Sequence, residues 1–261
     1  QTALANQLAY LRDHAVVLPL REAVARLRSN TLPECSVSIT FDDGYANNLH
    51  LAYPLLQMHG LPATIFLATA YLELGRFFPF DSMRLIQLHR TEKGESRSRP
   101  VNAAPDYFRD SLDQVLQYID KEWSVVEARL SEEQRQTFRP LSVEEIKRFD
   151  PQLIELAPHS HRHCILRNET PAQRKQEIAL SVEKLEQWTG KPVKLFAYPN
   201  GERGDFNEKD KDVLRSLGVE SAVTIIRGAN GGKTDPLELR RYGVGLYHGI
   251  DSFIAEVTGF R

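Results

Sequence analysis

Two adjacent carboxylates, Asp42 and Asp43, follow the apolar run that ends at Phe41 and precede Gly44. Burying even one unpaired carboxylate costs several kcal/mol, so two of them at the end of a buried strand are expected where a metal ion or a reaction uses them. Successive residues of a strand point to opposite faces, but the chain turns at Gly44, so both side chains can reach one cleft. One carboxylate could then bind a metal ion while the other accepts a proton from water.

A cluster of histidines supplies further metal donors. His159, His161 and His163 are three of the eight histidines in the chain, and they fall within five positions. A spacing of four returns to the same face in a helix and in a strand, so His159 and His163 can bind one ion in either conformation. His161 can join them only in a strand, which makes it the weaker candidate. Imidazole and carboxylate donors suit zinc, cobalt and nickel, so they predict a divalent metal without selecting one.

Each motif alone has an ordinary structural explanation. Asp and Gly are common turn residues, and a His-x-x-x-His pair occurs on the surface of many helices. The combination favours a metal site, because each motif lies at the end of a predicted strand, and α/β folds place their active sites at strand ends.

The rest of the sequence alternates short β-branched runs with longer amphipathic segments, which is the pattern of an α/β fold. The predicted strands are Val37–Phe41, Ala63–Leu67, Leu153–Leu156, Leu195–Tyr198, Ser221–Ile225 and Leu239–Val244. The predicted helices are Asn48–His59, Ser142–Phe149, Ala172–Trp188, Glu208–Leu217 and Ser252–Val257. These elements predict one domain over residues 1–261.

Residues 71–140 interrupt this alternation and are predicted to be an insertion between two strands. They contain an aromatic cluster of Phe77, Phe78 and Phe80, and then the polar run Arg90–Pro100. The polar run is expected to be a solvated loop, since such clusters of charged and small polar residues favour exposure. The aromatic residues are expected to pack in the core in preference to stacking on a sugar.

Composition excludes several classes of partner. The chain has 261 residues, is 41% hydrophobic, and balances 33 Lys and Arg against 35 Asp and Glu, so neither nucleic acid nor an anionic membrane surface is indicated. No apolar stretch reaches the roughly 18 to 20 residues of a transmembrane helix.

Cys35 and Cys164 are expected to be unpaired. The chain starts at Gln1, so a trimmed or mature form is expected, and the compartment stays open between cytoplasm and cell envelope.

The residues Thr-Phe-Asp-Asp-Gly-Tyr at 40–45 and His159-Ser160-x-x-His163 resemble the first two motifs of the polysaccharide deacetylase family, the NodB-homology carbohydrate esterases. The similarity continues through 196–201 to 235–241 and covers most of the chain from Val16 onward. The resemblance implies a distorted (β/α) barrel with a divalent metal, usually zinc, at the C-terminal ends of its strands. It also implies an acetylated polysaccharide or oligosaccharide as the substrate.

The same resemblance assigns roles to residues. It implies that Asp43, His159 and His163 are the metal ligands and that Asp42 is the general base. It further implies that the backbone N–H of Asn200 helps to hold the oxyanion formed in the reaction. The family commonly has tyrosine at that position, but a backbone donor tolerates Asn.

This chain also departs from the family pattern. Many members carry an arginine that orients the base where this chain has Ala197, so Arg240 or Arg241 is expected either to take that role or to form only surface salt bridges. His248 is the one candidate for the catalytic acid, although a histidine in a Gly-flanked loop is more often simply exposed.

The expected activity is hydrolysis, with a metal-activated water and Asp42 as the general base, of N-acetyl groups on a polysaccharide that contains N-acetylglucosamine. The resemblance points to a bacterial exopolysaccharide or a related glycan as that substrate. One alternative is an O-acetyl esterase on the same scaffold, which shares the oxyanion chemistry and differs in the leaving group. The other is a catalytically silent carbohydrate-binding protein, which Ala197 and the undefined catalytic acid make credible.

Overall fold

The computed structural model describes residues 2–92, 104–245 and 249–258. Within them the strands are β1 (Val16–Val17), β2 (Ser36–Val37), β3 (Ile39–Phe41), β4 (Ala63–Leu67), β5 (Ile154–Pro158), β6 (Leu195–Ala197), β7 (Ser221–Arg227) and β8 (Leu239–Arg241). They form three parallel sheets, in the orders β1-β2, β3-β4-β5 and β6-β7-β8. Parallel pairing requires a crossover between successive strands, and helices supply most of these crossovers.

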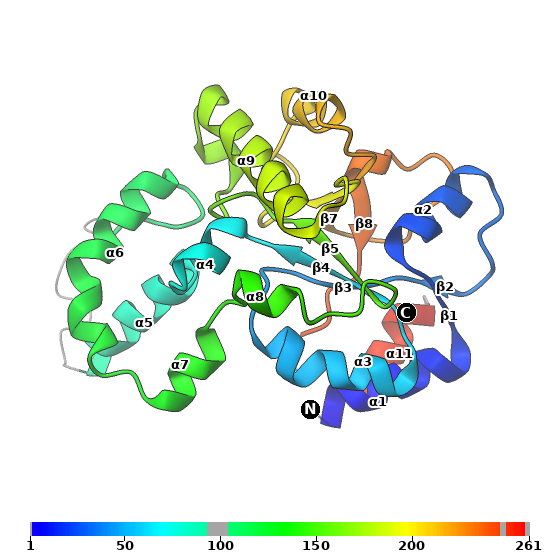
Figure 1. Cartoon of the computed structure of the whole chain (residues 1–261), viewed down its shortest axis with the longest axis horizontal. Coiled ribbons are helices and arrows are strands. Elements are labelled where there is room, and N and C mark those ends of the chain that lie inside the picture. The colour runs from blue at the N-terminus through cyan, green and yellow to red at the C-terminus, as the bar shows by residue number, and fades with distance from the viewer. Residues whose placement is uncertain (1, 93–103, 246–248, 259–261) are drawn as a thin grey trace.

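The helices are α1 (Thr2–His14), α2 (Leu20–Arg28), α3 (Tyr53–His59), α4 (Thr69–Leu74), α5 (Pro79–Glu92), α6 (Leu112–Glu127), α7 (Glu132–Phe138), α8 (Val143–Ile146), α9 (Pro171–Thr189), α10 (Glu208–Ser216) and α11 (Ile250–Thr258). A π-helical turn, η1 (Asn48–Ala52), runs directly into α3. Figure 1 shows α9 and α10 along one side of the strands and α1, α3 and α11 along the other.

The predicted α/β class is confirmed, whereas closure of the strands into a barrel is not shown. Over the described residues the ladder hydrogen bonds stay within the three separate sheets. The sheets nevertheless meet, because β5 lies beside β6. At the other edges, Arg241 of β8 donates from Nη1 to Oγ1 of Thr40 in β3, over 3.2 Å. Side chains and packing therefore join the strands where backbone pairing is missing.

Most predicted elements are present, with shifted ends. The predicted strand Leu239–Val244 stops at Arg241, and the predicted helix Ser142–Phe149 is the single turn α8. The helices α1 and α2 and the strand β1 were not predicted from the sequence. The reason is visible in α1, which buries only Gln7, Leu8 and Leu11 and so presents a narrow apolar stripe with a weak periodic signal.

Residues between β4 and β5 form a helical insertion of α4 to α7 before the short α8. Figure 1 shows α5, α6 and α7 together at one end of the molecule, away from the strands. The helix α6 buries Leu112, Val115, Ile119 and Val126 and packs on α5. Of the polar run predicted as a loop, residues 90–92 end α5, and 93–100 lie outside the described residues.

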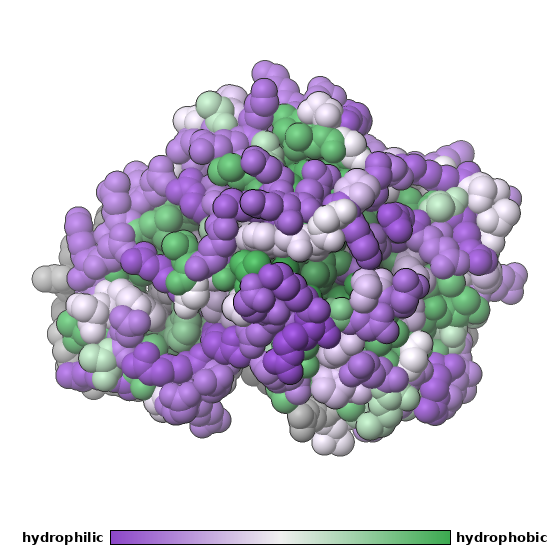
Figure 2. Space-filling view, viewed as in Figure 1, coloured by the Kyte–Doolittle hydropathy of each residue, from purple (hydrophilic) through white to green (hydrophobic). Residues whose placement is uncertain are grey.

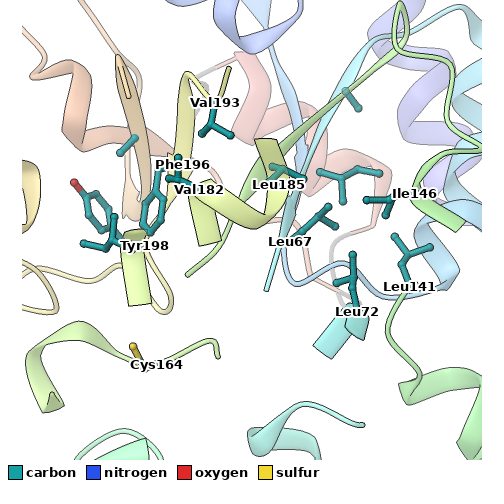
Figure 3. Packing of buried hydrophobic residues seen from close by; sticks show 14 of the residues in the cluster. Leu67, Leu72, Leu141, Ile146, Cys164, Val182, Leu185, Val193, Phe196 and Tyr198 are labelled. Atoms are coloured by element: carbon teal, nitrogen blue, oxygen red, sulfur yellow. The ribbon is translucent and has the colours of Figure 1, made fainter. Parts of the chain in front are cut away.

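The position of β4 in the core explains why its sequence is a continuous apolar run. All five of its residues are buried, because β4 is the central strand of its sheet and both faces are covered. Figure 3 shows Leu67 of β4 gathered with Leu185 of α9 and Ile146 of α8 in one buried cluster. This packing fixes the C-terminal end of β4 next to the segments that follow β3 and β5.

The outer surface agrees with the balanced composition. Figure 2 shows one face on which hydrophilic residues predominate and hydrophobic ones appear in patches between them. Among the described helices, none has both the length and the apolar composition that crossing a membrane requires. Cys35 is exposed and Cys164 is buried, and both are free, as predicted.

The segment after the insertion returns to the turn that carries the two carboxylates. Backbone hydrogen bonds join Ala46 N–H to the carbonyl of Arg139 (3.0 Å) and Leu141 N–H to the carbonyl of Gly44 (2.8 Å). Arg139 is held by a bidentate ion pair with Glu145, at 2.7 and 2.9 Å. Glu145 also accepts from the backbone N–H of Ser142 at the start of α8. The ion pair thus secures the strand-like contact that supports the turn.

We expect Glu145→Gln to lower the free energy of unfolding by roughly 1 kcal/mol at pH 7, because it weakens both an ion pair and a helix cap. Hydrogen bonding from Arg139 lowers the pKa of Glu145 to about 2 from its ordinary 4.5. A lowered pKa stabilises the fold above the unfolded value, and this contribution is lost as the pH falls from 4.5 toward 2. The difference between variant and wild type should therefore be at least halved at pH 3.

Urea unfolding at both pH values measures this effect, with Glu144→Gln as the control. Glu144 also pairs with a lysine, but its side chain is 81% exposed, so its loss should change stability little. An equal effect of the two variants at pH 7 would contradict the role given to Glu145.

Candidate metal centre

The residues of the centre lie at the C-terminal ends of neighbouring strands. Asp42 and Asp43 directly follow β3, His159 directly follows β5, and Ala197 and Arg241 are the last residues of β6 and β8. The strands are parallel within each sheet, and the contacts His159–Ala197 and Asp42–Arg241 bring the C-terminal ends of the two sheets together. Open α/β sheets bind ligands at this end of their strands. The sequence prediction of carboxylates and histidines at strand ends is therefore borne out by their positions.

Three side chains converge with the geometry of a metal site. Oδ1 of Asp43 lies 3.0 Å from Nε2 of His163 and 3.5 Å from Nε2 of His159. One donor atom from each residue falls within 4.8 Å of the others. The two imidazoles are nearly perpendicular, with ring centroids 4.7 Å apart. Two imidazole nitrogens and one carboxylate oxygen are a donor set that fits a divalent ion with positions left open for other ligands.

The backbone around the donors adopts conformations that side chains normally avoid. Asp43 and His163 have φ values of 71° and 56°, in the left-handed region. Such conformations cost of order 1 to 3 kcal/mol each and persist where the surrounding structure enforces them. Gly44 has a φ of 88°, and a Cβ there would lie 2.6 Å from Cδ2 of Leu67, so the close packing of β4 requires glycine.

His159 is fixed by the sheet itself. Its Nδ1 lies 2.8 Å from the carbonyl oxygen of Ala197 at the end of β6. A carbonyl oxygen can only accept, so Nδ1 carries the hydrogen and Nε2 turns its lone pair toward Asp43. Burial lowers the pKa of His159, which favours the neutral imidazole that a metal requires.

His163 is fixed by the helical insertion. Its Nδ1 lies 2.6 Å from the hydroxyl of Tyr107, which also donates to the backbone carbonyl of His163. The ring of Phe80 packs on the imidazole, with centroids 5.0 Å apart, and Phe78 lies at 6.3 Å. Phe78 and Phe80 thus belong to the core packing, as expected, and they also pack beside a candidate metal ligand. Sequence analysis missed Tyr107, because no motif or spacing relates it to His163.

A second contact from the insertion reaches the carboxylate turn. The hydroxyl of Tyr45 donates to Oδ2 of Asp81 in α5 over 2.5 Å. Burial raises the pKa of Asp81 to about 6, and the hydrogen bond from Tyr45 opposes that rise. Asp81 therefore adds a largely buried acid close to Asp43, which the sequence analysis also missed.

Asp42 is bound to an arginine and stays outside the donor cluster. Nη1 and Nη2 of Arg241 lie 2.7 and 2.8 Å from the two carboxylate oxygens of Asp42. Burial alone raises the pKa of Asp42, but the charge and hydrogen bonds of Arg241 outweigh it and bring the pKa to about 2. Of the two arginines considered for a contact with Asp42, Arg241 therefore makes it, whereas Arg240 is exposed. The alternative that both arginines form only surface salt bridges is wrong for Arg241.

The other predicted residues fall at different places. Asn200 lies in the loop after β6 with a φ of 58°, and its side chain donates to Asp205 over 2.6 Å. His161 turns away from the donor cluster and contacts the hydroxyl of Thr69 at 2.9 Å, in line with its weaker candidacy. His248, the candidate acid, lies outside the described residues.

A second acidic cluster, formed by Glu208, Asp235 and Glu238, does not compete for a metal ion. The buried ammonium group of Lys211 lies 2.7 Å from Glu208 and 2.9 Å from Asp235, and also contacts Glu238. Burial lowers the pKa of Lys211, but these three carboxylates raise it further, so the lysine stays charged and occupies the cluster. It already supplies the positive charge that a metal would bring.

We expect the protein to bind one divalent ion. Loss of a residue that only hydrogen-bonds to a metal ligand typically weakens metal affinity roughly 10- to 100-fold. His163→Ala removes a proposed ligand itself, so we expect it to raise the Kd of the metal by more than that. At a free metal concentration of about 100 times Kd, binding should stabilise the wild type by about 2.7 kcal/mol. Calorimetric titration and thermal unfolding with added metal measure both effects. His161→Ala is the matched control and should bind like the wild type; equal losses in the two variants would contradict the assignment.

Comparison with known proteins places the chain among deacetylases. The family model for polysaccharide deacetylase matches residues 29–222, well over half of the chain. YxkH of Bacillus subtilis (strain 168), which is named as a polysaccharide deacetylase, is 42% identical over 62 residues. That match covers 23% of this chain and 22% of YxkH, so it spans less than a quarter of that relative.

Several solved structures resemble most of the chain, and two of them serve as examples. The Streptococcus pyogenes deacetylase PplD, in complex with acetate, has a TM-score of 0.67 and 18% identity, and the match covers 98% of this chain and 86% of that one. A de-N-acetylase from Aggregatibacter actinomycetemcomitans has a TM-score of 0.62 and 16% identity, over 96% of this chain and 87% of that one. At these identities the likeness shows the fold. The family match, on a chain whose Asp-His-His donors meet at one strand edge, shows that this protein belongs to the polysaccharide deacetylase family of hydrolases.

Proposed function

We propose that the protein removes N-acetyl groups from a polysaccharide that contains N-acetylglucosamine. The reaction would use a divalent metal ion, with zinc as the first candidate, held by Asp43, His159 and His163. One observation carries the proposal: the three donors lie within 4.8 Å of one another, and the adjacent carboxylate of Asp42 is held apart from them by Arg241. The site therefore offers a place for a metal and a separate group that can accept a proton.

A metal ion bound there would polarise the acetyl carbonyl and make a nearby water more acidic. Asp42 is the group that we propose accepts the proton of that water. Its side chain is 29% exposed, so water can reach it. Arg241 holds both carboxylate oxygens in a fixed orientation and keeps them ionised, which is the state that a base needs.

The loop after β6 is proposed to stabilise the negative charge that develops on the acetyl oxygen. Asn200 lies three residues beyond Ala197, whose carbonyl fixes His159. Within the described residues no hydrogen bond uses the backbone N–H of Asn200, so this donor is available. A backbone N–H that points at the oxyanion can supply a large part of its stabilisation.

The last step of amide hydrolysis needs a proton for the leaving nitrogen, because an amine is expelled far more readily than an amide anion. His248 is the proposed donor, on the resemblance alone. An ester would need less help at this step, since its leaving oxygen is the weaker base. The preference for N-acetyl groups is supported by the de-N-acetylase among the structural relatives.

The direct test is to incubate the protein with acetylated chito-oligosaccharides and to assay acetate and free amine in parallel. Samples should contain added zinc or a chelator, and Asp42→Asn should be measured beside the wild type. The proposal predicts equal amounts of acetate and amine, with release lost on chelation and reduced roughly 10²- to 10⁴-fold in the variant. Acetate without amine would point to an O-acetyl esterase. Glycan binding without turnover, insensitive to chelation, would point to a silent carbohydrate-binding protein.

Removal of Arg241 provides a separate test of the base. In Arg241→Gln we expect kcat/KM to fall by about 10- to 100-fold, because Asp42 loses its fixed orientation. Its pKa, now about 2, should rise, since burial is then opposed by less positive charge. The acid limb of the pH profile of kcat/KM should consequently move to higher pH.

Arg240→Gln is the matched control, because it removes the neighbouring exposed arginine. It should leave both kcat/KM and the acid limb unchanged. An unshifted acid limb in Arg241→Gln, together with near wild-type activity, would show that the ion pair does not serve the reaction.

A further inference from the structure

The two histidines of the centre are fixed in different ways. His159 is held by a backbone carbonyl of β6, which is part of the sheet. His163 is held by the side chain of Tyr107, which lies in the helical insertion between α5 and α6. Tyr107 is 8% exposed, and the sequence around it carries none of the motifs that identify the family. The hydroxyl of Tyr107 thus gives the insertion a hydrogen bond to a histidine of the metal centre.

The direction of the hydrogen bonds around this hydroxyl follows from the number of protons. The Tyr107 oxygen lies within hydrogen-bonding distance of both the carbonyl oxygen and Nδ1 of His163. A tyrosine hydroxyl has one proton, and a carbonyl oxygen can only accept, so that proton goes to the carbonyl. The contact with Nδ1 must then use a hydrogen on Nδ1. Nε2 lies 3.0 Å from Oδ1 of Asp43, to which it can donate a hydrogen; when a metal ion replaces that hydrogen, the lone pair of Nε2 is available to the ion.

We propose that Tyr107 is a positioning residue of the metal centre, which holds His163 in the Nδ1–H tautomer and aims its Nε2 at the metal position. The proposal rests on the metal centre proposed above. It gives the insertion a defined task, because Tyr107 contacts Nδ1 and the ring of Phe80 packs on the imidazole, while Asp43 contacts Nε2. Outer hydrogen bonds of this kind orient metal-binding histidines in general.

A purely structural explanation is that a buried tyrosine simply needs a partner for its hydroxyl. Tyr71 offers the comparison. It is equally buried, contacts the same aromatic cluster through Phe78, and donates to the backbone carbonyl of Arg162, one residue before His163. Its hydroxyl serves the same loop but touches no imidazole. Tyr71→Phe and Tyr107→Phe therefore remove the same atom from neighbouring positions with different consequences.

The experiment measures the Kd of zinc and cobalt for wild type, Tyr107→Phe and Tyr71→Phe by competition with a chromophoric chelator, with unfolding of the metal-free proteins as a check of the fold. We expect Tyr107→Phe to weaken binding about 10- to 100-fold and to change the visible spectrum of bound cobalt, while Tyr71→Phe does neither. Equal Kd values for Tyr107→Phe and wild type, or equal losses in both variants, would overturn the role of Tyr107. Absence of metal binding by the wild type would instead overturn the centre itself.

A measurement on the wild type keeps the proposal testable if Tyr107→Phe does not fold. Long-range ¹H–¹⁵N correlation spectra of the zinc-loaded protein distinguish the two ring nitrogens of each histidine. The proposal predicts hydrogen on Nδ1 and zinc on Nε2 for His163, as for His159. Zinc on Nδ1 of His163, or an Nδ1 without hydrogen, would contradict it.

Discussion

The carboxylates of Asp42 and Asp43 are adjacent in sequence and repel each other. In the structure each one contacts a different partner, which either carries a positive charge or forms hydrogen bonds. Asp42 pairs with Arg241 from the end of β8, whereas Asp43 faces the imidazoles of His159 and His163. The left-handed turn at Asp43 and the glycine after it make this separation possible. Everything else in the fold serves to bring these partners, which are far apart in sequence, to the end of β3.

The parallel strands provide most of that alignment. The C-terminal ends of four strands, β3, β5, β6 and β8, meet at one place. They bring together the two carboxylates, a histidine, the carbonyl that fixes it and an arginine. Arg241 also links β8 to Thr40 of β3, where no ladder hydrogen bonds join the described strands. The helical insertion adds contacts that the strands do not supply, through Tyr107 to His163 and through Asp81 to Tyr45.

The sequence predicted what depends on local pattern. The apolar run of β4, the carboxylates after β3 and the four-residue spacing of His159 and His163 could each be recognised without a structure. Contacts between distant segments could not: the choice of Arg241 over Arg240 depends on which side of β8 faces Asp42, and Tyr107 lies 56 positions from the histidine it contacts. The helix α1 was missed because its apolar stripe is narrow, and barrel closure was expected from the family resemblance alone.

The central claim is that one divalent ion is held by Asp43, His159 and His163 while Asp42 remains paired with Arg241. A crystal structure of the zinc-loaded protein, with anomalous scattering recorded on both sides of the zinc absorption edge, tests it most directly. The structure predicts one strong anomalous peak at about 2.0 to 2.2 Å from Nε2 of each histidine and from an oxygen of Asp43. A zinc ion bound by Asp42 with Arg241 displaced, or a peak only at the Glu208, Asp235 and Glu238 cluster, would contradict it.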